Sequence, residues 1–444
     1  MNKKFLAGFI LGFIIANLLQ AQINTKVNLN FEKKLPEWMA EYHVPAVGVG
    51  IIEEGKIKYV KVFGELKKGI PAPDDAIFNV GSITKPVFAL FTLKLVEAGL
   101  WDLDEPLFHY WTDPDVANDP YHKELTTRHV LTHQTGFPNW RIKNPSNKLT
   151  FEFEPGTKFQ YSGEGFLYLQ RAMENKFHKP MAGLMDSILF EPFGMKNSGL
   201  IWNKDQDSER YAEWHDSQGN LLDPSTPEFR PANAAGSMVS TVEDMCILGV
   251  HMINGTGIFS KYYNEMVKKQ VIIDKHNAEG LGWGITCNLS DGEYVINHSG
   301  WDQGVKTICL FLPESKRGIV VLTNADNGII VYYKIISQAI DVGEEFLSYI
   351  FGTTKHNVIL IPDNVLQQYT GKYIDSYNRI LTISQTGNAL KVEGNGMPTL
   401  KIFPETEHTF YPKEFEYQFE FINSDSLNII IDNKIENIAK KISN

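Results

Sequence analysis

The sequence contains few cysteines. Only Cys246, Cys287 and Cys309 occur among 444 residues, widely spaced and mostly in apolar surroundings. This number and spacing exclude a disulfide-rich scaffold and a cysteine-based metal site. We interpret the three cysteines as buried free thiols, two of which could form one disulfide in an oxidising compartment. None of the three cysteines has the surroundings expected of a nucleophile.

The sequence also lacks any concentrated run of basic residues. Its formal net charge is −11, from 42 Lys and Arg against 53 Asp and Glu, and the charges are spread along the chain. A surface for nucleic acid or for an anionic membrane requires clustered Lys and Arg, so neither partner is expected. We expect a small-molecule or peptide substrate, and the oligomeric state is left open.

No long apolar run occurs after the N-terminus. There, two lysines precede an apolar run from Phe5 to Leu19, and the small residue Ala21 follows. This order is typical of a cleaved signal peptide at residues 1–21 and is too short and asymmetric for a membrane span. We therefore expect a secreted or periplasmic protein without stable membrane insertion. An uncleaved anchor is the alternative, and no cysteine follows the cleavage point to indicate a lipid anchor.

The order of apolar patterns predicts a mixed α/β (α+β) fold. Residues 46–64 alternate as a hairpin around Glu54-Gly55, a mostly helical region follows to about residue 235, and strands return over 281–324. Two β-rich blocks around a helical middle indicate one sheet completed from both ends, covered by a helix near 330–350. We assign residues 22–355 to this main domain. Residues 356–444 form a C-terminal accessory domain of short alternating strands, a small barrel or sandwich.

The stretch FNVGSITKPVFAL (residues 78–90) places Ser82 three residues before Lys85. It reads either as an ordinary helix start, with Ser as cap and Pro in the first turn, or as a chemical pair. If the helix begins at Ser82, the two side chains share a face and the Ser82 N–H is free for an oxyanion. The apolar run that follows would lower the pKa of Lys85 and make it a base.

Two further stretches carry groups that fit such a site. Tyr161 lies in the Gly-flanked sequence EPGTKFQYSGEGF and could shuttle protons. His298 lies in INHSGWDQG, a strand in which Gly300 would let a substrate backbone approach closely. Taken singly, the first is an ordinary turn and the second is more often a packed histidine.

Together the three motifs resemble a known superfamily. Their order is similar to the Ser-x-x-Lys, Tyr-x-Asn and Lys- or His-x-Gly motifs of serine β-lactamases and penicillin-binding proteins, in the branch of class C-like enzymes, esterases and D-aminopeptidases. The resemblance covers about residues 35–345. It implies an antiparallel sheet flanked by helices, a helical subdomain and a β-barrel behind them. Supporting stretches are LTTRHVLTHQTGFP, LFEPFGMKNSG, AAGSMVSTVEDM, GLGWGI and FLPESKRGIVVLTNAD.

The resemblance also implies a role for each motif residue. Ser82 would be the acylated nucleophile, with Lys85 and Tyr161 as the base pair. His298 would orient the tyrosine and the substrate, and the N–H groups of Ser82 and Trp301 would form the oxyanion hole. The implied reaction is acyl transfer through an acyl-enzyme, without cofactor or metal.

One motif departs from the family pattern. Where the family has Asn, this chain has Gly163, which has no amide to contact the lysine or the substrate. Glu164 could supply an acceptor instead or could cap the following helix. We expect substrate contacts from Gly163, Glu164, Ser299 and Gly300. Efficient β-lactam hydrolysis is the activity that the missing amide most puts in doubt.

Other functional classes are weighed against the serine hydrolase. His129 and His133 have the spacing of a helical metal pair, but the resemblance makes their segment structural. The sequence has no Gly-x-Ser-x-Gly, which weighs against an α/β-hydrolase. A non-catalytic penicillin-binding or sensor protein of the same fold, and an acyltransferase, are the alternatives to a hydrolase that acts on an amide or an ester.

Overall fold

A computed structural model describes most of the chain. The described residues are 28–201, 209–222, 232–352, 356–376, 378–413, 415–431 and 434–442. The predicted signal peptide, residues 1–21, lies outside them. Within the described residues, no helix combines the length and the apolar character that crossing a bilayer requires.

The main domain is built on a nine-stranded antiparallel sheet. The strand order is β3-β2-β1-β11-β10-β9-β8-β7-β6, so the N-terminal strands adjoin the C-terminal ones, as predicted. Val49 of β1 pairs with Val321 of β11 at this junction. The strands are β1 (Ala46–Glu53), β2 (Lys56–Lys67), β3 (Ile70–Pro71), β6 (Val271–Ile272), β7 (Asn277–Glu279), β8 (Gly284–Thr286), β9 (Val295–Asp302), β10 (Val305–Leu312) and β11 (Arg317–Thr323).

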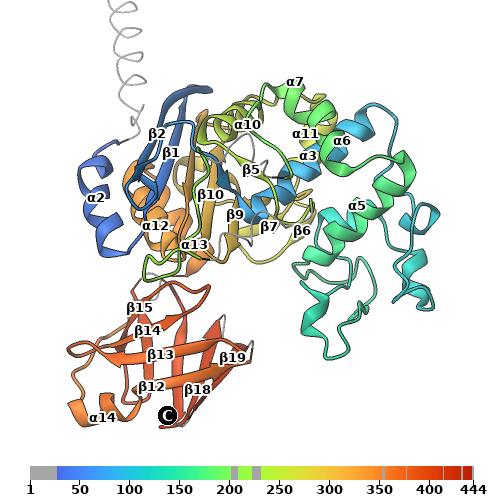
Figure 1. Cartoon of the computed structure of the whole chain (residues 1–444). Helices are drawn as coiled ribbons and strands as arrows, with labels where there is room; N and C mark the ends of the chain where they lie inside the picture. The colour runs from blue at the N-terminus through green and yellow to red at the C-terminus, as the bar shows by residue number, and fades with distance from the viewer. Residues whose placement is uncertain are drawn as a thin grey trace, which may run out of the picture.

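Helices cover both faces of this sheet (Figure 1). One face packs on α2 (Phe31–Glu41), α12 (Gly328–Ala339) and α13 (Gly343–Phe351) through a continuous apolar core. The sequence predicts one helix near residues 330–350, but the structure has two helices, α12 and α13, in this region. The chain is extended at Ile340, and a Cβ on Gly343 would lie 2.2 Å from the carbonyl oxygen of Ile336, so the second helix packs directly on the end of the first.

The other face packs on the helical region predicted between the β-rich blocks. Its longest helices near the sheet are apolar on nearly all sides, as buried helices should be. The helices are α3 (Thr84–Glu97), α4 (Thr127–Leu131), α5 (Gly163–Phe177), α6 (Met181–Met185), η5 (Asp186–Phe190), α7 (Glu191–Phe193), α10 (Val242–Asn254) and α11 (Ser260–Val267). Short 3₁₀ turns are η1 (Gly81–Ile83), η2 (Leu107–His109), η3 (Pro120–Lys123), η4 (Arg141–Lys143) and η6 (Ser290–Gly292). A two-stranded ribbon pairs β4 (Phe78–Asn79) with β5 (Val239–Ser240).

The C-terminal region is a closed eight-stranded antiparallel barrel, which confirms the predicted β-barrel class. Each strand pairs with the next, and β19 returns to pair with β12. The elements are α14 (Asp363–Gln368), β12 (Gly371–Asp375), β13 (Ile380–Gln385), β14 (Leu390–Gly394), β15 (Leu400–Pro404), β16 (Thr409–Pro412), β17 (Gln418–Asn423), β18 (Ser426–Ile431) and β19 (Lys434–Lys441). The domain boundary at 355/356 stays a prediction.

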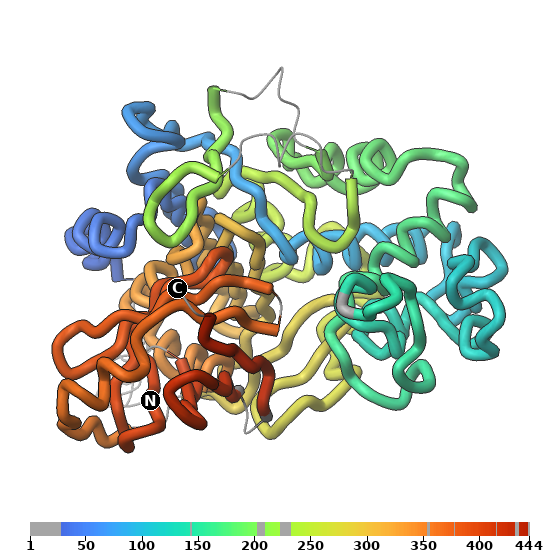
Figure 2. The backbone as a smooth tube through the Cα atoms, turned by 60° about the horizontal axis from the view of Figure 1, so that its bottom comes forward, coloured from blue at the N-terminus to red at the C-terminus, as the bar shows by residue number. Residues whose placement is uncertain are grey.

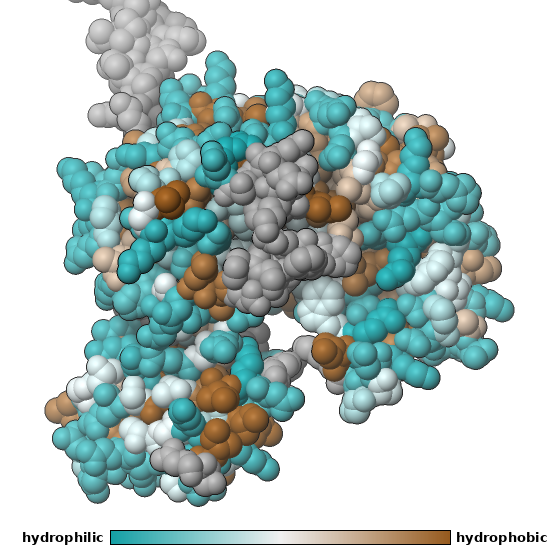
Figure 3. Space-filling view, in the orientation of Figure 1, coloured by the Kyte–Doolittle hydropathy of each residue, from teal (hydrophilic) through white to brown (hydrophobic). Residues whose placement is uncertain are grey.

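The surface is largely hydrophilic, with apolar side chains gathered on one side of the barrel (Figure 3). Among the exposed large apolar residues of the barrel, Ile374, Ile380 and Ile438 lie on the neighbouring strands β12, β13 and β19. Inside the main domain, in contrast, all three cysteines are buried and free. Burial raises the pKa of the Cys309 thiol to about 12, which agrees with inert, buried thiols.

Candidate active site

Ser82 lies in the 3₁₀ turn η1, directly before α3. The helix itself begins at Thr84, two residues later than predicted, so Ser82 precedes the regular helix. Gly81 has φ +56°, and its N–H donates to Oδ1 of Asn79 at 2.6 Å. This left-handed residue turns the chain sharply and presents Ser82 at the helix mouth.

Lys85 lies beneath Ser82 and is fully buried. Its Nζ is 3.1 Å from Oγ of Ser82 and donates to the carbonyl of Ala235 at 2.7 Å. Burial lowers the pKa of Lys85 to about 7, against a smaller opposing effect from Asp302. A large share of this amine is therefore neutral at neutral pH.

Tyr161 covers the same pair from the helical side. The Lys85 Nζ lies 4.8 Å from the centre of its ring, and its hydroxyl hydrogen-bonds with Ser82. Burial raises the pKa of Tyr161, the Ser82 hydrogen bond lowers it, and the nearby Glu279 carboxylate raises it. Because the net shift is upward, the phenol keeps its proton at neutral pH.

His133 supports Tyr161 from behind. Its ring stacks on the phenol ring with centres 4.3 Å apart, and its Nδ1 accepts a hydrogen bond from the N–H of Ser162 at 3.1 Å. A stacked neighbour and a fixed following residue leave Tyr161 little freedom to rotate. His133 is thus a positioning residue, a role that its spacing from His129 did not predict.

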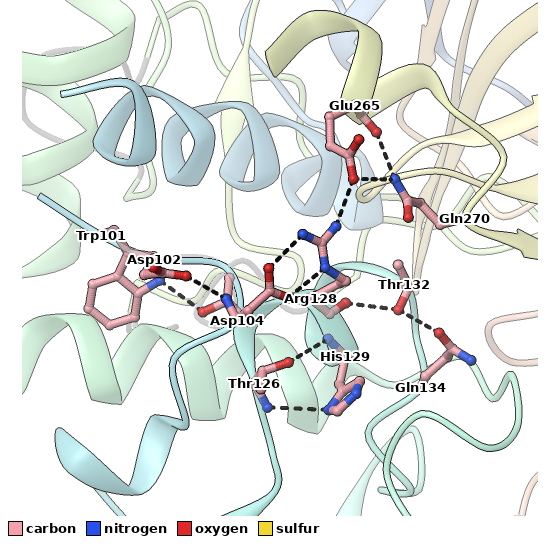
Figure 4. A network of polar contacts seen from close by, with 11 residues as sticks. Trp101, Asp102, Asp104, Thr126, Arg128, His129, Thr132, Gln134, Glu265 and Gln270 are labelled. Carbon is pink, nitrogen blue, oxygen red and sulfur yellow. Dashed lines mark hydrogen bonds and ion pairs between the residues drawn. The ribbon is translucent and has the colours of Figure 1, made fainter. Parts of the chain in front are cut away.

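A polar network anchors the helix that leads into His133 (Figure 4). Arg128 of α4 donates to Asp104 through Nε at 2.6 Å and through a terminal nitrogen at 2.8 Å, and also to Glu265 of α11 at 2.8 Å. His129, on the same helix, accepts from the N–H of Thr126 instead of sharing a ligand with His133. The described residues contain no group of three side chains fit to hold a metal.

His298 and Trp301 reach Ser82 from strand β9. The His298 ring lies 6.3 Å from the Tyr161 ring, and its Nδ1 hydrogen-bonds to the carbonyl of Ser299 at 2.7 Å. Burial and then the Lys85 charge lower the pKa of His298 to about 3, so the imidazole is neutral. A Cβ on Gly81 would lie 3.0 Å from the backbone nitrogen of Trp301, which places that nitrogen beside the serine turn.

Gly300 lies where strand β9 packs against the turn that carries Ser82, whereas we expected it to admit a substrate backbone. A Cβ there would lie 2.0 Å from the carbonyl oxygen of Val80 and 2.2 Å from Oγ1 of Thr307. The glycine therefore admits the protein's own serine turn against β9, and Thr307 fastens that turn by donating to the Val80 carbonyl at 2.8 Å. Gly300 does not line the cavity at Ser82. The structure thus gives Gly300 a packing role, and the substrate contact expected there stays a prediction.

Gly163 and Glu164 do not line the Ser82 cavity either, and the substrate contacts expected of them stay predictions. Three nitrogen atoms of Arg141 donate to the Glu164 carboxylate at 2.9–3.0 Å, so Glu164 lines a different cavity. A Cβ on Gly163 would lie 2.5 Å from the ring of Trp140, which occupies the space that a family Asn would need. Asn139 accepts from the Gly163 N–H at 2.9 Å and lines the Ser82 cavity with Trp140.

One cavity of about 440 Å³ contains Ser82, Tyr161 and His298. Ser299 also lines it, and the end of α13 and strands β7–β9 form its far wall. Figure 2 shows the backbone around residues 270–290, in yellow, between the orange and red barrel and the blue-green segment before α5. Sequence reasoning missed Asn139, Trp140 and Glu279, because none of them stands in a recognisable motif.

Comparison with known proteins identifies the family. The family described as Beta-lactamase matches residues 31–329, which is more than half of the chain. The chain belongs to the β-lactamase family. This membership confirms the predicted superfamily and fold, and at this coarse level the chain is a serine hydrolase.

The relatives of this β-lactamase family member include penicillin-binding proteins and an esterase. Penicillin-binding protein 4* of Bacillus subtilis is 22% identical over 430 residues, which cover 87% of this chain and 92% of that protein. Esterase EstB of Burkholderia gladioli is 27% identical over 206 residues, covering 39% of this chain and 51% of the esterase. The octameric penicillin-binding protein homologue from Pyrococcus abyssi shares the fold, with a TM-score of 0.62 at 22% identity over 92% of this chain and 99% of that one.

Proposed function

We propose that this protein is a secreted hydrolase that cleaves an amide or ester bond through an acyl-enzyme on Ser82. The observation that carries the proposal is the buried Lys85, whose Nζ lies 3.1 Å from Oγ of Ser82. A serine hydroxyl is a weak nucleophile unless a neighbouring base removes its proton. An amine with a pKa near 7 is such a base at neutral pH.

Acylation then proceeds with each group in a defined role. Neutral Lys85 accepts the hydroxyl proton as Oγ of Ser82 attacks the substrate carbonyl. The N–H groups of Ser82 and Trp301 stabilise the oxyanion, since the serine turn and β9 meet there. Tyr161 keeps its proton, so it is the donor that protonates the leaving group, and Lys85 returns the proton to Tyr161.

His298 contributes position and not charge. Its imidazole is neutral and hydrogen-bonded to the Ser299 carbonyl, so it packs beside Tyr161 without adding a second cation next to Lys85. This neutrality avoids a costly pair of like charges in a buried site. Water completes the reaction by attacking the acyl group, with the same residues acting in reverse order.

Covalent labelling tests the nucleophile. After incubation with a fluorophosphonate, intact mass should show one adduct per chain, and peptide mapping should place it on Ser82. Ser82→Ala should remain unlabelled, whereas the surface control Ser290→Ala should label like the wild type. An adduct that persists in Ser82→Ala would contradict the assignment.

A second candidate is a sensor that binds β-lactams without efficient turnover, and a separate alternative is an acyltransferase, which passes the acyl group to a nucleophile other than water. The observation that favours the sensor is Gly163, where no side-chain amide is present and Trp140 fills the space. A panel of p-nitrophenyl esters, nitrocefin and D-aminoacyl anilides separates these functions. Hydrolysis of an ester or anilide with little nitrocefin turnover supports the hydrolase. Stable penicillin adducts without turnover of any substrate would support the sensor.

Export is a further part of the proposal. The lysines and apolar run of residues 1–21 support cleavage by a signal peptidase. N-terminal sequencing of protein expressed with its own leader should begin at residue 22. A chain that retains Met1 in the membrane fraction would instead indicate an uncleaved anchor.

A further inference from the structure

Glu279, at the end of β7, is a buried acid that the proposed reaction does not use. Its residue is only 6% exposed, yet it lines the cavity that contains Ser82. Its Oε1 has no hydrogen-bond partner among the described residues. Burial alone raises the pKa of this carboxyl to about 8. A buried acid without a partner, aimed into a substrate cavity, is suited to recognise part of the substrate.

The strand register places a second acceptor beside it. Glu279 pairs with Gly284 of β8, and Gly284 pairs with Asn297 of β9, so the three positions lie side by side across the sheet. Gly284 has no side chain and leaves a gap between its two neighbours. A Cβ there would lie 3.2 Å from Oδ1 of Asn297, which shows that this oxygen faces the gap.

The hydrogen bonds leave oxygen atoms, and no nitrogen donor, facing this gap. The Asn297 amide donates to the Gly284 carbonyl at 3.3 Å and to Oγ1 of Thr286 at 3.2 Å. Thr286 in turn donates its hydroxyl proton to Oδ1 of Asn277 at 3.0 Å. What remains for a ligand is the Glu279 carboxyl and Oδ1 of Asn297. A substrate carboxylate would meet a second acid there, whereas an ammonium group offers three donors and the charge that compensates an ionised Glu279.

Glu279 also lies on a defined side of the reacting bond. Asn297, which lies beside it across the sheet, directly precedes His298, whose ring lies 6.3 Å from the Tyr161 ring, while Trp301 lies three residues farther along β9. In the proposed reaction Tyr161 protonates the leaving group, while the oxyanion lies at the other side of Ser82, toward Trp301. Glu279 and Asn297, on the Tyr161 side of Ser82, therefore face the leaving group of the substrate and not its acyl chain.

We propose that Glu279 and Asn297 form a subsite for a primary ammonium on the leaving group of the substrate. The proposal rests on the proposed function, because it uses the proton donor to define the leaving-group side. An ammonium there would supply the partner that Oε1 lacks, and ion pairing would offset the cost of a buried carboxylate. The substrate class is thus an amide or ester whose amine or alcohol part carries a basic nitrogen.

Matched esters test the subsite. We would compare kcat/KM for 4-(aminomethyl)phenyl butyrate and its neutral isostere 4-ethylphenyl butyrate. The wild type should prefer the ammonium ester by about tenfold or more, the value of a charge-assisted hydrogen bond. Glu279→Gln should lose this preference, so that its two kcat/KM values become equal within about twofold. A control at Glu293, a buried acid that does not line the cavity, should keep the preference as Glu293→Gln.

Ligand binding separates this proposal from the proposed function. Ser82→Ala should bind benzylammonium at least about tenfold more tightly than benzyl alcohol by calorimetry, and adding Glu279→Gln should abolish the difference. This result needs no turnover, so it would stand even if neither ester were hydrolysed. Equal binding of the two ligands, or a preference unchanged in the Glu279→Gln background, would overturn the subsite. Hydrolysis of neither ester with the binding preference intact would instead overturn the proposed function.

Discussion

At the residue scale, the proposed reaction depends on the protonation states of Lys85 and Tyr161, which are neighbours in one buried site. Burial lowers the pKa of Lys85 to about 7, so much of this amine is neutral at neutral pH. Burial also raises the pKa of Tyr161, so the phenol keeps its proton. Opposite effects on a cationic and a phenolic group thus give one base and one acid from a single desolvated environment. His298, neutral in the same surroundings, adds no competing charge.

The pH dependence of acylation should report Lys85. Because the base must be neutral, the acylation rate should rise as pH passes through about 7 and level off above it. An ordinary lysine would give a rate that still rises toward pH 10.5. Stopped-flow labelling from pH 5 to 10 measures the profile. Lys85→Ala should lower the rate by roughly 10²–10⁴-fold, whereas Lys94→Ala, at the other end of α3, should not.

Removal of one hydroxyl tests Tyr161. Tyr161→Phe should lower acylation by about 10²-fold or more, because the leaving group loses its proton donor, while the stacking on His133 is kept. Tyr168→Phe is the matched control, since its hydroxyl donates to the Trp111 carbonyl at 3.3 Å and Tyr168 does not line the Ser82 cavity. Thermal melting should show both variants folded. Wild-type acylation by Tyr161→Phe would mean that another group donates the proton.

At the element scale, the site depends on the close approach of the turn η1 to strand β9. Gly300→Ala should destabilise the protein by about 1–3 kcal/mol, because the new methyl would overlap the Val80 carbonyl and Thr307. It should also slow acylation by moving Trp301 away from Ser82. Urea unfolding and the labelling rate measure the two effects. Gly183→Ala, with nothing within 4 Å of the new Cβ, should change neither.

The same elements show how much the sequence could predict. Alternation and turn residues predicted the 46–64 hairpin, the joined sheet and the barrel, because these patterns are local. Ser82, Lys85, Tyr161 and His298 stand in short motifs, and the structure brings them together. Glu279 and Asn297 meet only through the register of three strands, and the bond of Glu164 to Arg141 joins the first turn of α5 to the turn η4, so no local pattern predicts either contact. The break at Ile340 was missed because no proline marks it.

At the scale of the whole molecule, one buried ion pair joins the sheet, the site and the barrel. Lys306 and Asp326 are both fully buried, with Nζ 3.0 Å from Oδ1. Asp326 also accepts from the N–H of Gly304, just after Trp301, at 2.7 Å and from the N–H of Gly396 in the barrel at 3.0 Å. The barrel is therefore attached to the residue that shapes the end of β9.

Breaking this pair should affect both stability and activity. Asp326→Asn should cost about 3–5 kcal/mol, because Lys306 would be left as a buried cation without its partner. Acylation should also slow, since Gly304 would lose its anchor. Adding Lys306→Met should recover much of the stability but not the rate. If the double variant is no more stable than Asp326→Asn, the penalty does not come from the unpaired lysine.

The most direct measurement for the central claim is the acyl-enzyme itself. Protein is quenched with acid during turnover of p-nitrophenyl butyrate, and its intact mass and peptides are recorded. We predict a transient gain of one butyryl group on the peptide that contains Ser82, absent in Ser82→Ala and accumulating more slowly in Lys85→Ala. Steady hydrolysis of the ester by wild-type protein with no acylated Ser82 at any quench time, or with the butyryl group on another residue, would contradict the account.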